Sequence, residues 1–311
     1  MIDPEARAYL DSIASLGLPP LAEQGAVGAR RLNSLRAPSL AGELEDVALI
    51  EDGRLPGPGG QIPFRRYSPA PDRTLPALLY LHGGGWVVGD LDTHDSVCRA
   101  LARRVECVVL ALDYRLAPEN PFPAAVEDAW TGLSWLRDHA TDVGADPDRI
   151  AVAGDSSGGN LSAVVARSRE RGGPKLAAQV LIYPVTDCDF DTASYRDAAT
   201  GYGLTRDSML WYWDQYMPDE AKRESPDASP LRAADLSGLP PALVITCKLD
   251  PLASEGAAYA EALRSAGVRV EHVCEPDMIH GYIRMNGVVS RARKSWDDCA
   301  RFLRREFDSG D

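Results

Sequence analysis

Short apolar runs alternate with helix-like segments from about residue 45 onward, and this alternation limits the possible folds more than any other feature of the sequence. Most of the runs are rich in β-branched residues, as buried strands are. They cover residues 77–81, 107–112, 150–153, 177–183, 242–247 and 268–274. The helix-like segments cover residues 93–104, 123–139, 157–171, 253–266 and 288–307. This order predicts an α/β fold in which helices cover both faces of a mostly parallel sheet.

A hairpin is expected ahead of this alternation. Two apolar runs, residues 47–51 and 62–67, flank the segment 53–60, which is rich in glycine and proline. Such a segment favours a reversal of the chain. We therefore expect the two runs to form an antiparallel hairpin at the leading edge of the sheet.

Two segments interrupt the alternation and are candidates for a cap over the site. Residues 1–44 hold helix-like stretches without a strand pattern, and residues 187–239 are aromatic in the middle and rich in proline afterwards. The sequence thus predicts one α/β domain, residues 45–186 with 240–311, that carries N-terminal cap helices and a cap insertion. The aromatic side chains either pack an extra helix on the core or wall a pocket. They are Trp211, Tyr212, Trp213 and Tyr216.

Charge and hydropathy exclude several classes of partner. The chain has 311 residues and a formal net charge of −13, which opposes long-range attraction to nucleic acid or to an anionic membrane surface. The start of the chain lacks the pattern of a secretory signal, and no stretch reaches the roughly 18 apolar residues of a membrane helix. We therefore expect a cytoplasmic protein with a small-molecule substrate. The oligomeric state, including a homodimer, stays open.

The cysteine pattern argues against a metal site. The six cysteines are scattered, with no C-x-x-C pair, and we interpret them as small buried apolar side chains. They are Cys98, Cys107, Cys188, Cys247, Cys274 and Cys299. No cluster of histidine, cysteine and carboxylate has the spacing of metal ligands, so no metal and no cofactor are expected.

The segment Gly154-Asp155-Ser156-Ser157-Gly158 fits the nucleophile elbow G-x-S-x-G. The motif alone is weak, but here a predicted strand precedes it and a predicted helix follows it, which is the setting that exposes the serine oxygen. Glycines on both sides let the backbone adopt a strained turn without collisions. Ser156 is therefore the candidate nucleophile. Ser157 lies one place off the glycine frame, and its amide is a candidate oxyanion donor.

A second motif, His82-Gly83-Gly84-Gly85-Trp86, ends an apolar strand. Acyl transfer places negative charge on a carbonyl oxygen, and fixed backbone N–H groups stabilise that charge. Only glycine, which has no side chain, allows the main chain to approach the carbonyl oxygen of the substrate so closely. No phosphate-binding pattern follows the motif, and we interpret it as part of an oxyanion hole.

The general base should be a histidine after the elbow, because this arrangement presents serine, acid and histidine in that order. Two histidines qualify. His272 lies inside a predicted strand, whereas His280 lies past that strand in a loop, at the carboxyl edge where α/β sheets place their sites. His280 is the candidate base.

The candidate base follows the predicted strand 268–274, and the acid should follow the predicted strand before it. That strand, residues 242–247, leads directly into Lys248-Leu249-Asp250-Pro251. Asp250 is therefore the candidate acid. Glu255, on the next helix, is the alternative, and we expect it to be a helix cap or a surface charge.

With these motifs in place, the chain from about residue 75 onward resembles the hormone-sensitive lipase family of α/β-hydrolases, especially its bacterial esterases. The resemblance also includes the segments 113–119, with the sequence DYRLAPE, and 122–125, with the sequence FPAA. It implies the α/β-hydrolase fold, an oxyanion hole lined by Gly84, Gly85 and the Ser157 amide, and a helical cap from the two interrupting segments.

The resemblance gives further residues a role near the site. Arg115, Glu119 and Asp155 look like positions that support it, with ordinary ion pairs as the alternative. Ser157, Ser254 and Tyr282 depart from the commonest family pattern, which typically has alanine, aspartate and phenylalanine at these places. None of these departures removes a member of the candidate triad.

Together these features predict a serine carboxylesterase that hydrolyses small esters with short to medium acyl chains through an acyl-enzyme. One alternative is a deacetylase or lactonase of a secondary-metabolite pathway, with the same chemistry in a different pocket. A more remote one is a non-catalytic ligand-binding receptor of the same fold, since plant gibberellin receptors are among the proteins that the chain resembles. Amide hydrolysis remains possible but is more demanding, because an amine is a poorer leaving group than an alcohol.

Overall fold

The computed structural model describes residues 1–309, and its centre is an eight-stranded sheet with the order β1-β2-β4-β3-β5-β6-β7-β8. The first two strands are antiparallel to their neighbours, and all later pairs are parallel. The strands are β1 (Leu49–Gly57), β2 (Gly60–Ser68), β3 (Leu75–Leu81), β4 (Val108–Leu112), β5 (Ala145–Asp155), β6 (Ala178–Ile182), β7 (Ala242–Leu249) and β8 (Val270–Ile279). The predicted α/β class is confirmed.

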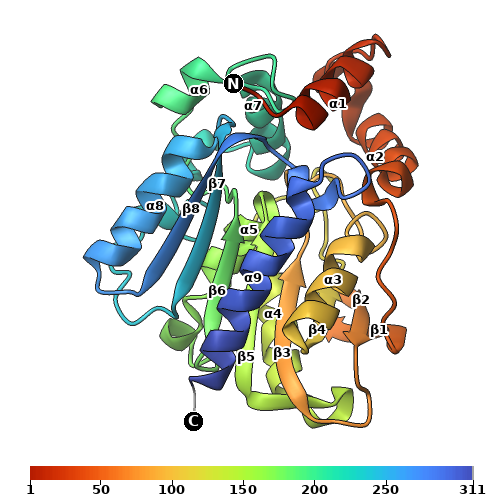
Figure 1. Ribbon diagram of the computed structural model, residues 1–311. Helices are drawn as coiled ribbons and strands as arrows, with labels where there is room; N and C mark the ends of the chain where they lie inside the picture. The colour runs from red at the N-terminus through yellow and green to blue at the C-terminus, as the bar shows by residue number, and fades with distance from the viewer. Residues whose placement is uncertain (310–311) are drawn as a thin grey trace.

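Helices cover both faces of this sheet (Figure 1). One face packs against α3 (Asp95–Val105) and α9 (Arg291–Asp308), and the other packs against α4 (Ala124–Asp138), α5 (Ser157–Val165) and α8 (Ala253–Ser265). The central strands alternate accordingly: Tyr80 of β3 belongs to the α3 and α9 side of the core, and Leu79 belongs to the α4 and α5 side. Strands buried on both faces explain their continuous apolar runs.

Several predicted boundaries are wrong in detail; β5, for example, begins at Ala145, five residues before the predicted strand 150–153. The segment 53–60 was expected to be the hairpin turn, but β1 extends to Gly57 and β2 begins at Gly60, so the turn is much tighter. The predicted helix at 157–171 ends as α5 at Val165, and the short helix η2 (Ser168–Arg171) follows. Strand β8 continues to Ile279, which leaves His280 directly at its end.

The interrupting segments form four further helices above the carboxyl edge of the sheet (Figure 1). The first segment contributes α1 (Pro4–Ala14) and α2 (Leu21–Ala41), and the second contributes α6 (Ala193–Asp197) and α7 (Arg206–Tyr216). Helices α2 and α7 contact one another although about 170 residues separate them in the chain. No helix among residues 1–309 is long and apolar enough to cross a membrane.

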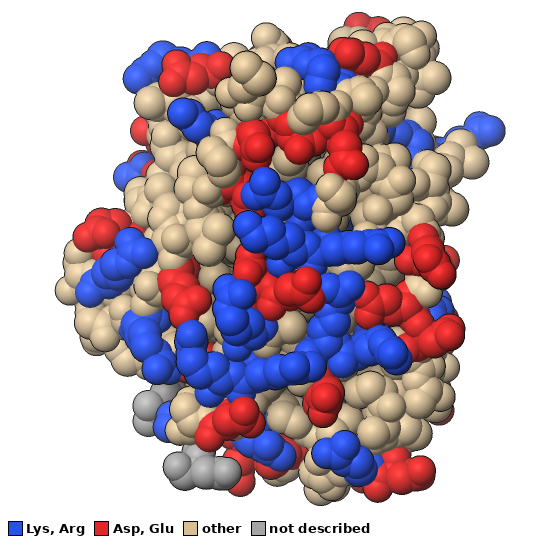
Figure 2. All heavy atoms as spheres, in the orientation of Figure 1, with Lys and Arg blue, Asp and Glu red and all other residues tan. Residues whose placement is uncertain are grey.

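Charged side chains cover the outer face of α3 and α9, where blue and red atoms alternate (Figure 2). Arg104 pairs with Glu45 and Asp297, and Arg305 pairs with Glu271 and Glu306. The arginines here are thus partly neutralised by neighbouring carboxylates. Glu306 is buried beneath this face, whereas Asp297 is exposed, and an exposed pair such as Arg104 with Asp297 contributes little to stability.

The cysteines follow the prediction in part. All six are free thiols, and four of them, Cys98, Cys107, Cys247 and Cys299, are buried in the core. Cys188 is half-buried and Cys274 is exposed on β8, so neither fits the interpretation as a fully buried apolar side chain. An edge strand leaves part of its surface in solvent, which accounts for Cys274.

Candidate active site

Ser156 occupies a sharp turn between β5 and α5. Its backbone has φ 57° and ψ −121°, in the left-handed region that a residue with a side chain rarely adopts. The Ser156 N–H donates to the carbonyl oxygen of Ile182 on β6 at 2.8 Å. The neighbouring strand therefore holds the strained turn in place, and the side chain projects beyond the edge of the sheet.

The two glycines of the elbow are required by close packing. A Cβ atom at Gly158 would lie 1.9 Å from the carbonyl oxygen of Leu81, and one at Gly154 would lie 2.3 Å from the carbonyl oxygen of Gly158. Both contacts are with backbone atoms that cannot move aside. The G-x-S-x-G spacing thus reflects how tightly α5 approaches β3 and β5.

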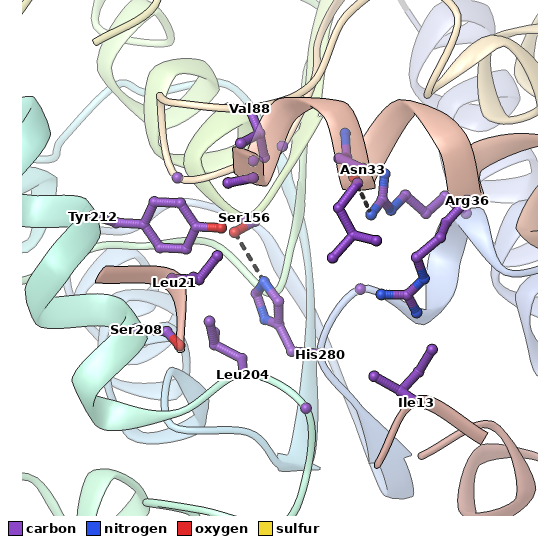
Figure 3. A pocket seen from close by; sticks show the side chains of 18 of the residues that line it. Ile13, Leu21, Asn33, Arg36, Val88, Ser156, Leu204, Ser208, Tyr212 and His280 are labelled. Atoms are coloured by element: carbon purple, nitrogen blue, oxygen red, sulfur yellow. Dashed lines mark hydrogen bonds between the residues drawn. The ribbon is translucent and has the colours of Figure 1, made fainter. Parts of the chain in front are cut away.

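A continuous chain of hydrogen bonds joins the three residues chosen from the sequence. Figure 3 shows the bond between Ser156 and His280. Nε2 of His280 lies 2.9 Å from Oγ of Ser156, and Nδ1 of His280 lies 2.7 Å from Oδ2 of Asp250. If Nδ1 donates to the carboxylate, Nε2 is left as an acceptor for the serine hydroxyl. This arrangement can remove a proton from Ser156.

Neighbouring groups fix the orientation of both His280 and Asp250. The ring of Tyr183 lies 4.5 Å from that of His280, between centroids. Asp250 is fully buried, and its Oδ1 accepts from the N–H of Leu252 at 2.9 Å. The carboxylate thus has one oxygen for the backbone and one for the imidazole.

Glu255 lies elsewhere and is not a surface charge, so that expectation is wrong. Its side chain is buried, and Oε1 accepts from the N–H of Thr186 at 2.7 Å and from the N–H of Asp187 at 3.4 Å. Burial raises the pKa of Glu255 well above its ordinary value, and the two backbone hydrogen bonds oppose that rise. Glu255 therefore fastens the start of the 187–239 segment to α8 and makes no hydrogen bond to His280.

The glycine loop after β3 leaves backbone N–H groups free beside Ser156. Gly84 and Gly85 have φ values of 131° and 60°, which only glycine adopts easily. No group within residues 1–309 accepts a hydrogen bond from the N–H of Gly84, Gly85 or Ser157. Ser157 is also the first residue of α5, where the helix dipole favours negative charge. Such unpaired donors suit a developing oxyanion.

Asp155 holds this loop against the elbow. Its Oδ1 accepts from the N–H of Gly83 at 3.0 Å and from the hydroxyl of Tyr80 at 2.8 Å, and Nε2 of His94 lies 3.3 Å away. Burial raises the pKa of Asp155, but His94 and Tyr80 outweigh this effect and hold the pKa below its ordinary value. The buried carboxylate therefore links the candidate nucleophile to the candidate oxyanion loop.

The other two supporting residues lie away from the triad. Arg115 makes hydrogen bonds to both carboxylate oxygens of Asp128, and Glu119 pairs with Arg30 of α2 at 2.6 Å. Arg115 is thus an ordinary ion pair, whereas Glu119 attaches the N-terminal segment to the α/β domain. His272, the alternative base, hydrogen bonds to Thr246 inside the sheet at 2.9 Å.

A cavity of about 360 Å³ opens above Ser156 and His280. Its floor includes the glycine loop, and its walls come from α1, α2 and the segment 203–212. Figure 3 shows the ring of Tyr212 extending from α7 toward Ser156, with Asn33 and Arg36 on the other side of the view. A substrate bound here would place its ester between these walls.

The aromatic residues in the middle of the insertion divide between the two roles expected for them. They are Trp211, Tyr212, Trp213 and Tyr216. Trp213 and Tyr216 are buried and pack against Trp86, with the Tyr216 ring stacked at 4.0 Å. Trp211 packs against α2, outside the cavity lining. Only Tyr212 lines the cavity. A helix turns its side chains in all directions, so one aromatic cluster can serve both the core and the pocket.

Comparison with known proteins agrees with this geometry. Residues 78–284 match the sequence model of a family described as having the alpha/beta hydrolase fold. The chain is 43% identical over 302 residues to the carboxylesterase NlhH of Mycobacterium tuberculosis, which covers 94% of this chain and 92% of NlhH. The chain belongs to the α/β-hydrolase family. Within it, the chain is a member of the hormone-sensitive-lipase-like group, as its motifs imply.

Other similar proteins are also esterases. The carboxylic ester hydrolase LipN of Mycobacterium tuberculosis is 46% identical over 243 residues, which cover 76% of this chain and 65% of LipN. The solved structure of an ester-hydrolase from the metagenome of Lake Arreo is 40% identical, with a TM-score of 0.95 over 99% of this chain and all of that one. This α/β-hydrolase is a carboxylic ester hydrolase.

Two functional features of this α/β-hydrolase were missed from the sequence. The buried contact of His94 with Asp155 was not expected, because His94 precedes the elbow and no local motif marks it. The cationic residues Arg36 and Arg284 of the cavity were not singled out either. Both features depend on which helices meet above the sheet, and a single sequence gives little signal for that.

Proposed function

We propose that this enzyme hydrolyses small esters with short to medium acyl chains, with Ser156 as nucleophile, His280 as general base and Asp250 as the acid that orients it. The hydrogen-bonded relay from Asp250 through His280 to Ser156 is the observation that carries the proposal. It is supported by the three unpaired backbone donors beside the serine. This combination suits acyl transfer.

The reaction follows from the positions of these groups. His280 takes the proton of Ser156 as Oγ attacks the ester carbonyl, and the resulting oxyanion accepts from the N–H groups of Gly84, Gly85 and Ser157. His280 then gives that proton to the departing alcohol, which leaves an acyl group on Ser156. His280 then deprotonates a water, which attacks the acyl carbon. As the bond to Ser156 breaks, His280 returns the proton to Oγ of Ser156 and the carboxylic acid product leaves. Asp250 stabilises the imidazolium in both halves.

We also propose that residues 1–44 and 187–239 act as a cap on an α/β domain formed by residues 45–186 and 240–311. Both segments lie above the carboxyl edge of the sheet, and both contribute side chains to the cavity. The ion pair of Arg30 with Glu119 fastens the first segment, and the buried Glu255 fastens the second. A cap of this kind would limit the length of the bound acyl chain.

The test is a panel of 4-nitrophenyl esters from acetate to palmitate, measured beside acetylated alcohols and lactones. The expected kcat/KM is highest for short to medium acyl chains and falls beyond about ten carbons, because the cavity is small. Ser156→Ala should abolish turnover of every ester while the circular dichroism spectrum stays unchanged. Faster turnover of long-chain esters would contradict the acyl range.

The same panel separates the alternatives. A deacetylase or lactonase would favour acetylated alcohols or lactones by a large factor over simple esters. A ligand-binding receptor would turn over none of them, and the complete relay speaks against that reading. The cytoplasmic location and the absence of nucleic acid and membrane partners stay predictions, and the oligomeric state stays open.

A further inference from the structure

The cavity above the candidate triad has a cationic side. Arg36 of α2 and Arg284, the last residue of the short helix η5 (Tyr282–Arg284), both line it, together with Asn33. Figure 3 shows Asn33 and Arg36 on one side of the Ser156 and His280 pair, and Leu21 and Tyr212 on the other. Ile13 also lies on the Arg36 side of this view, so the cationic groups are set among apolar side chains.

The cationic side offers donors without a matching acid. Arg284 donates to Oδ1 of Asn33 at 2.7 Å, and Arg36 donates to the hydroxyl of Tyr9. Within residues 1–309, neither guanidinium forms an ion pair with a carboxylate. Among the described residues that line the cavity, Asp155 is the one carboxylate. It accepts hydrogen bonds from Tyr80 and Gly83, and the charge of Arg284 helps to lower its pKa without a direct ion pair. Several N–H groups of the two arginines and of Asn33 therefore remain free to bind an anionic group.

The charge of Arg284 acts on two tyrosines that lie beside the candidate triad. Burial raises the pKa of Tyr212 to about 12, and the charge of Arg284 opposes that rise. The same charge opposes the rise that burial causes in the pKa of Tyr183, whose ring packs on His280. Arg284 and Ser156 also line the same cavity of about 360 Å³, so an anion bound to Arg284 can belong to the same small molecule as the ester at Ser156.

Arg36 and Arg284 place positive charge in the cavity of a chain that is negatively charged as a whole. With a formal net charge of −13, the protein repels anionic molecules at long range, so such a substrate needs a specific attraction inside the pocket. Guanidinium groups suit this role because they stay charged and their planar fork matches a carboxylate. We propose that Arg36 and Arg284 bind the carboxylate of the substrate, and that this enzyme prefers small esters that carry a free carboxylate. This inference rests on the proposed ester hydrolysis at Ser156.

Two substrate pairs test the preference and locate the carboxylate. For the acyl side, mono-4-nitrophenyl adipate is compared with its neutral analogue 4-nitrophenyl 6-oxoheptanoate. For the alcohol side, 4-(carboxymethyl)phenyl acetate is compared with 4-(carbamoylmethyl)phenyl acetate. The measured quantity is the ratio of kcat/KM for the anionic ester to kcat/KM for the neutral one, after subtraction of hydrolysis without enzyme. We expect a ratio of at least about ten in one of the pairs, as for a charged hydrogen bond.

The variants Arg36→Gln and Arg284→Gln remove one charge each and keep a hydrogen-bonding side chain. Each should lower this ratio by about threefold or more, and the double variant should bring it close to one. Arg7→Gln is the matched control, since Arg7 is exposed on α1, pairs only with Asp11 and does not line the cavity. Arg7→Gln removes one positive charge from the N-terminal segment that also holds Arg36. It should change the ratio of the unaltered enzyme by no more than about twofold.

Added salt gives a second measurement that needs no variant. Raising the ionic strength to about 1 M should lower the ratio of the unaltered enzyme, because screening shortens the reach of charge to about 3 Å. A ratio near one in both pairs, or a ratio that the double variant retains, would overturn the carboxylate preference while ester hydrolysis stands. Failure to hydrolyse any of the four esters would instead overturn the proposed function.

Discussion

The carboxyl edge of the sheet and the helical walls above it build this site in different ways. Ser156, Asp250 and His280 each follow closely on a strand of the sheet, and hydrogen bonds from neighbouring backbone hold the first two. The walls come instead from helices α1, α2 and α7, which lie outside the sheet and reach it through scattered contacts such as Arg30 with Glu119.

This difference separates chemistry from selectivity. The sheet edge allows almost no change, since a Cβ atom at Gly158 or Gly84 would lie within 2.0 Å of a backbone oxygen. The cavity walls present side chains such as Leu21, Leu204 and Arg36 whose replacement leaves the sheet intact. We therefore expect changes at the edge to reduce the rate for every ester, and changes in the walls to alter which ester is preferred.

The largest effect should come from the acid of the relay. Asp250→Asn keeps the shape but offers the wrong hydrogen-bonding group to Nδ1 of His280, and the corresponding change in a serine protease costs about 10⁴ in kcat. Glu255→Gln, also buried and five residues later, should cost far less, because its Oε1 contacts the backbone of Thr186 and Asp187 and not the imidazole. Both variants are measured on one activated ester.

This pair is the sharpest test of the sheet edge, because both carboxylates are buried and only five residues apart, yet only Asp250 contacts the imidazole. Circular dichroism must show that both variants are folded. If Glu255→Gln proved the more damaging variant, Glu255 would have to act on His280, and the assignment of Asp250 would be wrong.

A smaller effect should distinguish two aromatic neighbours in the walls. Trp213→Ala removes a fully buried ring that packs on Trp86 and should lower the free energy of unfolding by about 3 to 5 kcal/mol. Tyr212→Ala removes a ring that lines the cavity, and should lower it by less while shifting the acyl chain preference. Urea unfolding and the ester panel measure the two properties. Equal losses of stability would show that Tyr212 also belongs to the core.

The smallest effect concerns pH. Because burial raises the pKa of Glu255 above its ordinary value of 4.5, the folded state retains a proton that the unfolded state has lost. The stability that Glu255 contributes is complete below pH 4.5 and declines as pH rises, by up to about 1.4 kcal/mol per pH unit. Relative to Glu255→Gln, which does not titrate, the unaltered protein should lose stability between pH 5 and about pH 7. If the free energies of unfolding of the unaltered protein and of Glu255→Gln differed by the same amount at pH 5 and at pH 7, this would argue against a buried Glu255 that titrates.

Much of the sheet edge could be predicted from the sequence, for a physical reason. Residues at strand ends follow apolar runs that can be recognised, and the parallel order of the strands brings their carboxyl ends together. That is how Ser156, Asp250 and His280, far apart in the chain, were chosen before their geometry was known, and the structure brings all three within hydrogen-bonding distance. Their catalytic roles stay predictions.

The walls could be predicted only coarsely. Helices in residues 1–44 were expected, but the contact of α2 with α7 depends on packing between segments with no common pattern. The same limit explains Glu255, which was expected at the surface. A carboxylate five residues after Asp250 looks like a helix cap from the sequence, and only the backbone N–H groups of Thr186 and Asp187 provide a reason to bury it.

Covalent labelling tests the central claim most directly. A fluorophosphonate probe reacts with a serine that a neighbouring base activates, and peptide mass spectrometry locates the added mass. The relay predicts a label on Ser156 alone, formed much more slowly in His280→Ala and in Asp250→Asn. A label on Ser157 with Ser156 unmodified, or labelling of Ser156 at the same rate in His280→Ala, would contradict the account.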